Sequence, residues 1–391
     1  MGSFFNIMFK SNPAYIAFFI YAFVLGSLFP RIGDLQLHLG ISEGTLGLAL
    51  IGLPFGVQIS LLVADKILKY LNIRHVMLIG IPVIGLAFYL AALVDNWMIF
   101  CCFLFLAGLC VGILEVAVNL EADRIEYLVK RRIMNRSHSF WSLGFFATGI
   151  LGAGVAQLGI TPSLHFLVSA FTSTLVTAYY FRNYSPAPSR PGSDTSKPQF
   201  VLPTKSIMLL VVLTLSAMLV EGSGIDWSVI YMRDVHYTLP FVSGLAFAIG
   251  AFSQFLARFF ADEYVDKYGA EQTAKYSVLL MLIGVCCVTF ATSPLVALIG
   301  FAFMGAGNAV IFPLAISAAA QKTDRPAAVN VASLAQISFI VFLLAPPLLG
   351  FVAETFGIRL SFGLSIPFIF ISWLTLGALT EKHENPRFSS S

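Results

Sequence analysis

The sequence predicts an all-α polytopic membrane protein with twelve transmembrane helices, arranged as two pseudo-symmetric bundles of six. Three observations lead to this fold class. Of the 391 residues, 58% are hydrophobic and only 11% are charged, whereas a soluble domain carries about 25% charged residues. Apolar runs of about 20 residues, long enough to cross a bilayer core, recur along the whole chain. Short sequence patterns of the first half return in the second half.

The apolar runs are expected to be helices, because every backbone amide inside a bilayer needs a partner within the protein. A closed barrel would alternate apolar and polar residues with a period of two, and these runs are continuous. In the first half we expect helices near 14–32, 43–64, 75–94, 98–122, 137–158 and 163–181. In the second half we expect them near 206–232, 240–261, 272–291, 295–318, 328–351 and 359–380.

The longest polar segment divides the six expected helices of the first half from those of the second. Residues 182–205 contain Pro186, Pro188, Pro191, Pro198 and Pro203, a composition typical of a linker. The chain is therefore expected to consist of an N-terminal bundle at 1–181, a cytoplasmic linker at 182–205, and a C-terminal bundle with a short cytoplasmic tail at 206–391.

The distribution of positive charge predicts the orientation. The chain has 23 Lys and Arg residues, and all but Arg31, Arg233 and Arg359 fall on the side of the two termini. Loops rich in Lys and Arg remain in the cytoplasm. We therefore expect a multi-pass protein of the cell inner membrane with both termini in the cytoplasm.

The two halves share short patterns at a nearly constant offset. Gly47-Leu48-Ala49 opens the second expected helix, and Gly244-Leu245-Ala246 opens the eighth, 197 residues later. Gly152 and Gly350 correspond at an offset of 198. Parallel repeats of six helices joined by a cytoplasmic linker are typical of secondary transporters that bind substrate near the midplane, between the halves.

Several stretches resemble the major facilitator superfamily, and more narrowly its bacterial fucose-permease-like branch of uncharacterised transporters. They are Glu115 to Asn119 with His138 after it, Glu221-Gly222 through Asp226-Trp227 to Arg233-Asp234, and Ala345-Pro346-Pro347. The resemblance covers nearly the whole chain and implies the superfamily fold. It also implies proton coupling through acids on the first and fourth transmembrane helices. The first expected helix of this chain, 14–32, carries no acid, so the resemblance does not extend to sugar specificity.

Buried acids are the strongest candidates for the chemistry. An ionisable group at membrane depth costs about 2.5–3.5 kcal/mol on insertion scales. Glu115 and Asn119 are one helical turn apart and share a face. Glu221 lies near the centre of the expected helix 206–232, beside two glycines. A low-dielectric site favours the neutral form of a carboxyl, so both acids can exchange protons. The alternative for each is a structural hydrogen bond between helices.

Other polar residues are weaker candidates. His138 lies at the start of the expected helix 137–158 and could titrate near neutral pH. A structural role is the alternative. Further candidates for contact with substrate are Asn119, Asp226, Trp227, Gln58, Gln254 and Tyr21. The end of the expected helix 240–261 and the loop after it resemble part of the cytoplasmic loop signature of the superfamily. We therefore expect an inner gate formed by Arg258, Asp262, Asp266 and Lys267.

The leading functional hypothesis is a proton-coupled transporter of a small organic solute that works by alternating access, with uptake and export both open. The expected partners are the small-molecule substrate, protons and membrane lipids, with no nucleic acid, and we expect a monomer. A membrane enzyme is disfavoured because the sequence shows no zinc-ligand spacing, phosphate-binding loop or nucleophile elbow. The five cysteines lie in apolar runs, so we expect no metal site and no cofactor. A transport-inactive sensor or assembly factor remains the alternative.

Overall fold

The computed structural model describes residues 2–130, 133–188 and 201–380, and every regular element in these ranges is helical. Residues 189–200 of the expected linker, the basic residues Arg131 and Arg132, and the C-terminal tail lie outside them. The first half contains α1 (Gly2–Gly26), η1 (Phe29–Arg31), α2 (Ile32–Leu39), α3 (Glu43–Leu50), α4 (Gly52–Leu68), α5 (Ile73–Ala91), α6 (Trp97–Val129), α7 (Met134–Gln157) and α8 (Pro162–Phe181).

The second half begins with α9 (Lys205–His236), α10 (Pro240–Tyr268), α11 (Ala270–Phe290), α12 (Pro294–Asn308) and α13 (Ile311–Gln321). It continues with α14 (Ala327–Ser338), α15 (Ile340–Phe356), α16 (Ile358–Gly363), α17 (Ser365–Leu374) and η3 (Leu376–Leu379). Within the described residues, eleven helices are long and apolar enough to cross a membrane, and Ile358–Leu374 forms a shorter apolar helix at the twelfth expected position. The predicted all-α membrane class is confirmed.

Several helices extend beyond the apolar runs that predicted them. α6 continues to Val129, α9 continues to His236, and α10 continues to Tyr268. The extra turns contain Glu, Arg, Lys and Asp residues, which a hydropathy pattern assigns to loops. These residues can continue a helix whose backbone is already hydrogen-bonded. Helices α6 and α10 therefore reach beyond the predicted membrane boundary.

Two breaks inside the expected spans follow from proline. Pro54 and Pro313 have no N–H group for the carbonyl four residues earlier, and the ring pushes that carbonyl away. Those carbonyls belong to Leu50 and Ala309, which lie at the junctions between α3 and α4 and between α12 and α13. The second junction leaves the Ala309 carbonyl free to accept a hydrogen bond from another helix.

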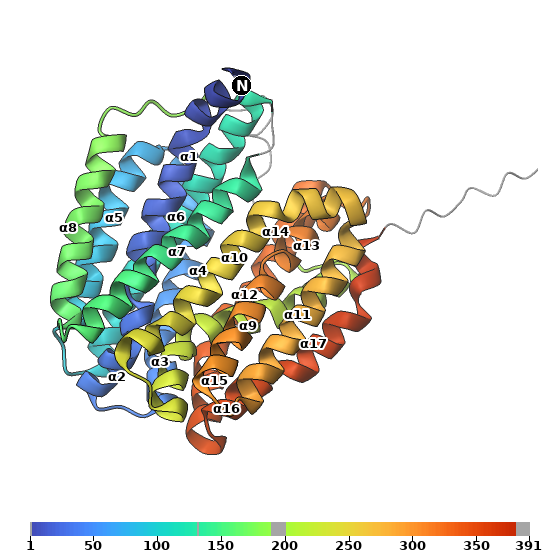
Figure 1. Cartoon of the computed structure of the whole chain (residues 1–391). Helices are drawn as coiled ribbons and strands as arrows, with labels where there is room; N and C mark the ends of the chain where they lie inside the picture. Colours follow the sequence, from blue (N-terminus) through green and yellow to red (C-terminus); the bar gives the residue numbers. More distant parts are fainter. Residues whose placement is uncertain (1, 131–132, 189–200, 381–391) are drawn as a thin grey trace, which may run out of the picture.

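The two halves are joined by polar contacts at the end of the molecule opposite the N-terminus, called the far end here. Figure 1 shows the halves meeting there, around α2, α3 and α15, and spreading apart towards the end that carries the N-terminus. Arg233 Nη1 donates to the Gly33 carbonyl at 2.8 Å, and its Nη2 donates to Gln36 Oε1 at 2.7 Å. Glu354 Oε2 accepts from the Gly44 amide at 3.0 Å.

The repeated glycines mark close approaches between the halves. A Cβ at Gly47 would lie 2.4 Å from the Pro346 carbonyl oxygen on α15, and a Cβ at Gly244 would lie 2.5 Å from Ala153 Cβ on α7. Only glycine permits such contact without moving a helix. The sequence repeat therefore has a physical cause: equivalent helices of each half pack directly against the other half.

This arrangement predicts a specific cross-link. A Cβ at Gly44 would lie 3.9 Å from Glu354 Cβ, close to the mean of about 3.8 Å in native disulfides. Gly44→Cys with Glu354→Cys, in a chain whose five cysteines are replaced, should form a disulfide with a mild oxidant in membranes. Gly154→Cys with Glu354→Cys is the matched control, because a Cβ at Gly154 has no neighbour within 4 Å. Equal cross-linking of the two pairs, or of neither, would contradict the described contact of α3 with α15.

Candidate functional site

One group of polar side chains lies between α1, α6 and α7, and is called the Glu115 group here. Asn119 Nδ2 donates to Glu115 Oε1 at 2.8 Å, as expected for residues one turn apart. His138 Nε2 lies 3.1 Å from Asn119 Oδ1, and Tyr21 lies within interaction range of the Glu115 carboxylate. Because the Asn119 amide nitrogen donates to Glu115, its oxygen faces His138. The His138 ring therefore carries its proton on Nε2.

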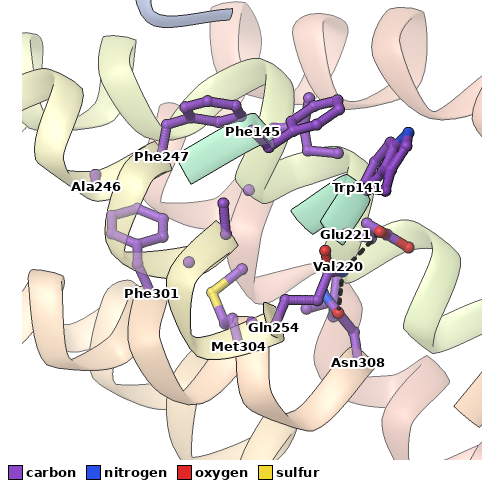
Figure 2. A pocket seen from close by; sticks show the side chains of 15 residues that line it. Trp141, Phe145, Val220, Glu221, Ala246, Phe247, Gln254, Phe301, Met304 and Asn308 are labelled. Atoms are coloured by element: carbon purple, nitrogen blue, oxygen red, sulfur yellow. Dashed lines mark hydrogen bonds between the residues drawn. The ribbon is translucent and has the colours of Figure 1, made fainter. Parts of the chain in front are cut away.

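A second group lies on the other side of the interface between the halves, and is called the Arg258 group here. Arg258 Nη2 lies 3.4 Å from Glu221 Oε1, and the two side chains are only 13% and 14% exposed. Gln254 Nε2 donates to Glu221 Oε1 at 2.7 Å and to Asn308 Oδ1 at 2.9 Å. Figure 2 shows these two bonds as dashed lines beside the cavity. The Arg258 group thus joins α9, α10 and α12.

The first half contributes one residue to this second group. Ser142 on α7 is fully buried. Its hydroxyl accepts a hydrogen bond from Arg258 Nη1 at 2.9 Å and donates to Gln254 Oε1 at 3.1 Å. The Arg258 guanidinium also lies 5.8 Å from the ring of Trp141 on the same helix as Ser142, within the range of a cation–π interaction.

The local backbone explains why these side chains meet. Arg258 Nε donates to the Ala309 carbonyl at 3.1 Å, the carbonyl that Pro313 leaves free. One turn away, a Cβ at Gly305 would lie 2.1 Å from the Gly250 carbonyl oxygen, so α10 and α12 touch there through their backbones. This close approach sets the spacing at which Gln254 and Asn308 can bond.

The cavity beside the Arg258 group is small and mostly apolar. Its volume is about 40 Å³, and its lining includes Trp141, Phe145, Phe247 and Phe301 beside the polar Glu221 (Figure 2). Such a volume accommodates water molecules. An organic solute needs a wider chamber, which requires the halves to move or aromatic side chains to change rotamer.

The two groups are close enough to influence each other. Arg258 lies within electrostatic range of Glu115 as well as Glu221, so one guanidinium faces carboxyl groups from both halves. The charge of Arg258 is therefore balanced by acids of both halves, and not by one helix alone.

The remaining candidates from the sequence lie elsewhere. Trp227 is fully buried, with its ring against Gly350 on α15, which is a packing position. Asp226 and Gln58 are half-buried on α9 and α4, and neither takes part in the hydrogen bonds of the two groups described above.

The four residues expected at an inner gate do not pair with one another. The i,i+4 spacing suggested that Arg258 pairs with Asp262, whereas the structure pairs Arg258 with Glu221 and bonds Asp262 to Asn135 on α7. Asp266 and Lys267 are exposed, and the Lys267 ammonium lies 4.9 Å from the Tyr268 ring centroid. The expected pairing of Arg258 with Asp262 is therefore wrong, because an acid on a neighbouring helix pairs with Arg258 in place of the acid on its own helix, while the gate role of the four residues stays a prediction.

Sequence reasoning also missed a buried acid near the linker. Glu121 on α6 is 1% exposed, and its Oε1 accepts from the Tyr184 hydroxyl at 2.6 Å and the Ala187 amide at 2.7 Å. Burial and this hydrogen bond raise the pKa of the Tyr184 hydroxyl well above its usual value. The contact fixes the start of the linker to the first half. An acid in the last turn of an apolar run was the available signal.

The other end of the linker is fixed to the second half. Asp324 accepts hydrogen bonds from the hydroxyls of Thr204 and Ser206 and from Asn330 Nδ2 at 2.9 Å. The hydroxyl bonds stabilise the carboxylate and lower the pKa of Asp324 to about 2. The carboxylate therefore keeps these bonds at neutral pH and loses them only in strong acid.

Comparison with known proteins decides the family. The model of the Major Facilitator Superfamily matches residues 14–339 and 209–391. The chain belongs to this superfamily. An uncharacterised MFS-type transporter of Yersinia pestis is 26% identical over 352 residues, covering 89% of this chain and 90% of the relative. The superfamily resemblance predicted from the sequence is confirmed, and so is the prediction of a transporter in place of an enzyme.

Solved structures of superfamily members share the fold. A mutant form of the nucleoside transporter NupG has a TM-score of 0.77 at 10% identity, covering 95% of this chain and 100% of that one. A mutant form of the E. coli fucose:proton symporter FucP has a TM-score of 0.65 at 15% identity, covering 96% and 99%. At these identities the likeness shows the superfamily fold alone.

The contact between α10 and α12 predicts a stability effect. Gly305→Ala would place a methyl group into the Gly250 carbonyl and push the helices apart. We expect a loss of about 1–3 kcal/mol, the usual cost of overpacking, measured as a lower melting temperature of the purified protein. Gly154→Ala is the control, because its Cβ would meet open space. A melting temperature for Gly305→Ala equal to that of the control would contradict the backbone contact.

Proposed function

We propose that this protein is a proton-coupled secondary transporter that moves a small polar organic solute by alternating access. The observation that carries the proposal is the position of Arg258. This largely buried cation lies at the interface of the halves with Glu221 beside it and Glu115 within electrostatic range. Ionisable groups at membrane depth are costly and usually serve transport. The fucose:proton symporter and the nucleoside transporter named above have the same fold, which agrees with the proposal.

In the proposed cycle, Glu115 and Glu221 are the proton-coupling acids, with His138 able to assist through Asn119. Protonation of either acid removes a negative charge that Arg258 attracts, and loosens the contact between the halves. The solute would bind among Asn119, Tyr21, Gln254 and the aromatic lining, with the chamber open to one side at a time. The polar contacts at the far end, between Arg233 and Gly33 and between Glu354 and α3, would close that side in the conformation described.

We further propose that the protein lies in the inner membrane as a monomer surrounded by lipid. The far end would face away from the cytoplasm, because Arg31, Arg233 and Arg359 are the few Lys and Arg residues assigned to that side, and both termini would then be cytoplasmic. The bundles at 1–181 and 206–391 would move as units about the linker, whose two ends are each hydrogen-bonded to a different half.

The test begins with a transported solute. A thermal-stability screen of sugars, nucleosides, amino acids and drugs should reveal it, because a ligand that binds only the folded state raises the melting temperature. Accumulation driven by an imposed pH gradient and solute counterflow are then measured in proteoliposomes.

Glu221→Gln keeps the size of the side chain and removes the titrating group. We expect it to abolish accumulation driven by the pH gradient while retaining counterflow, and we expect Glu115→Gln to weaken accumulation. Glu263→Gln, on the exposed surface of α10, is the control and should behave as wild type. If both Glu221→Gln and Glu115→Gln accumulate solute at the wild-type rate, neither acid couples protons to transport.

A further inference from the structure

The buried hydroxyl of Ser142 connects the two halves at the Arg258 group. Ser142 belongs to α7 in the first half, whereas Arg258 and Gln254 belong to α10 in the second. Both contacts of its hydroxyl cross the interface, at 2.9 Å and 3.1 Å. Its side chain is inaccessible to solvent, so these bonds are not exchanged for water in this conformation.

The directions of the hydrogen bonds in this group follow from its chemistry. An arginine side chain has only donors, so the Ser142 oxygen accepts from Arg258. The single Ser142 proton is then available for Gln254 Oε1. This fixes the amide orientation and directs Gln254 Nε2 to Glu221 Oε1 at 2.7 Å. Glu221 Oε1 thus receives donors from both Gln254 and Arg258, an arrangement that stabilises the carboxylate.

We propose that Ser142 is a positioning residue that orients Gln254 and Arg258 onto Glu221, and so links the proton on Glu221 to the contact between the halves. When α7 moves relative to α10, Ser142 loses both partners. Its hydroxyl has an alternative acceptor on its own helix, the His138 carbonyl at 3.4 Å. The Gln254 amide is then held only through its nitrogen, by Asn308 and Glu221, and can shift, which weakens the stabilisation of the Glu221 carboxylate. The inference rests on the proposed role of Glu221 as a coupling acid.

Few charged side chains surround Glu221, so the effect of Ser142 on the protonation of Glu221 can be measured. Arg258 on α10 pairs with Glu221, Glu115 on α6 and His138 on α7 lie within electrostatic range of Arg258, and Asp226 follows Glu221 on α9. Helices α12, α13 and α14 contain no Asp, Glu, His, Lys or Arg. On α15, Glu354 lies at the far end and bonds α3.

Trp141 provides a probe that requires no substrate. Its ring lies 5.8 Å from the Arg258 guanidinium and lines the same cavity as Glu221. The fluorescence of the purified protein is recorded as a function of pH, and the component that Trp141→Phe removes is assigned to Trp141. In wild type we expect a transition in this component, and Glu221→Gln should abolish it.

Ser142→Ala should move the midpoint of this transition to higher pH by about one unit, a tenfold change in proton affinity, because Glu221 holds its proton more tightly without oriented donors. Ser142→Thr keeps the hydroxyl and should restore the wild-type midpoint, while Ser142→Cys, with a weak donor, should resemble Ser142→Ala. Ser139→Ala is the matched control. Ser139 is equally buried on α7, but its hydroxyl bonds Arg136 of its own helix at 2.7 Å.

The outcomes separate this inference from the proposed function. If Glu221→Gln abolishes the transition but Ser142→Ala and Ser142→Cys titrate as wild type, the role of Ser142 is overturned and Glu221 remains the coupling acid. If Glu221→Gln leaves the transition unchanged, both proposals fall. A shift of equal size in Ser139→Ala would mean that any lost hydroxyl on α7 has this effect, and would overturn the specific role of Ser142. Size-exclusion profiles verify that each variant is folded.

Discussion

A largely buried arginine imposes the strongest constraint on this structure. A guanidinium inside the membrane-spanning part of a protein is stable only when its donors are satisfied and its charge is balanced. Arg258 meets this requirement with Glu221, the Ser142 hydroxyl and the Ala309 carbonyl. These three partners come from α9, from α7 and from the break between α12 and α13. One side chain therefore fixes the relative position of four segments.

The backbone is shaped to permit these contacts. Pro313 frees the Ala309 carbonyl, and the approach of Gly305 to Gly250 brings α12 close to α10. The repeated Gly47 and Gly244 likewise allow helices of the two halves to lie close together. Glycine and proline, which weaken helices in water, are tolerated here because neighbouring helices satisfy the freed backbone groups.

The helices and the fold class could be predicted from the sequence, because long apolar runs have one stable solution in lipid. The bond between Glu115 and Asn119 also follows from spacing alone. The pairing of Arg258 could not be predicted in this way. Its sequence neighbour Asp262 was the local choice, but Glu221 becomes adjacent only when α9 and α10 pack. Ser142 was missed as a site residue for a similar reason, since a serine in a membrane helix usually bonds its own backbone.

The partners of buried acids near helix ends were also beyond a hydropathy argument. The last turns of α6 contain Glu121, whose partners Tyr184 and Ala187 lie more than 60 residues later in the chain. A pattern within one helix contains no information about such partners. What the sequence did indicate was that costly buried acids exist, and the structure brings Glu221 together with Arg258 and places Glu115 within electrostatic range of it.

The central claim is that Arg258 and Glu221 stabilise each other inside the protein, and a double-mutant cycle tests it most directly. Free energies of unfolding are compared for wild type, Arg258→Gln, Glu221→Gln and the double variant in the same detergent. Removing one partner leaves the other buried without its counterion, whereas removing both does not. The account predicts that the double variant loses about 1–3 kcal/mol less stability than the sum of the single losses. Additive losses would show that the two groups do not interact and would contradict the account.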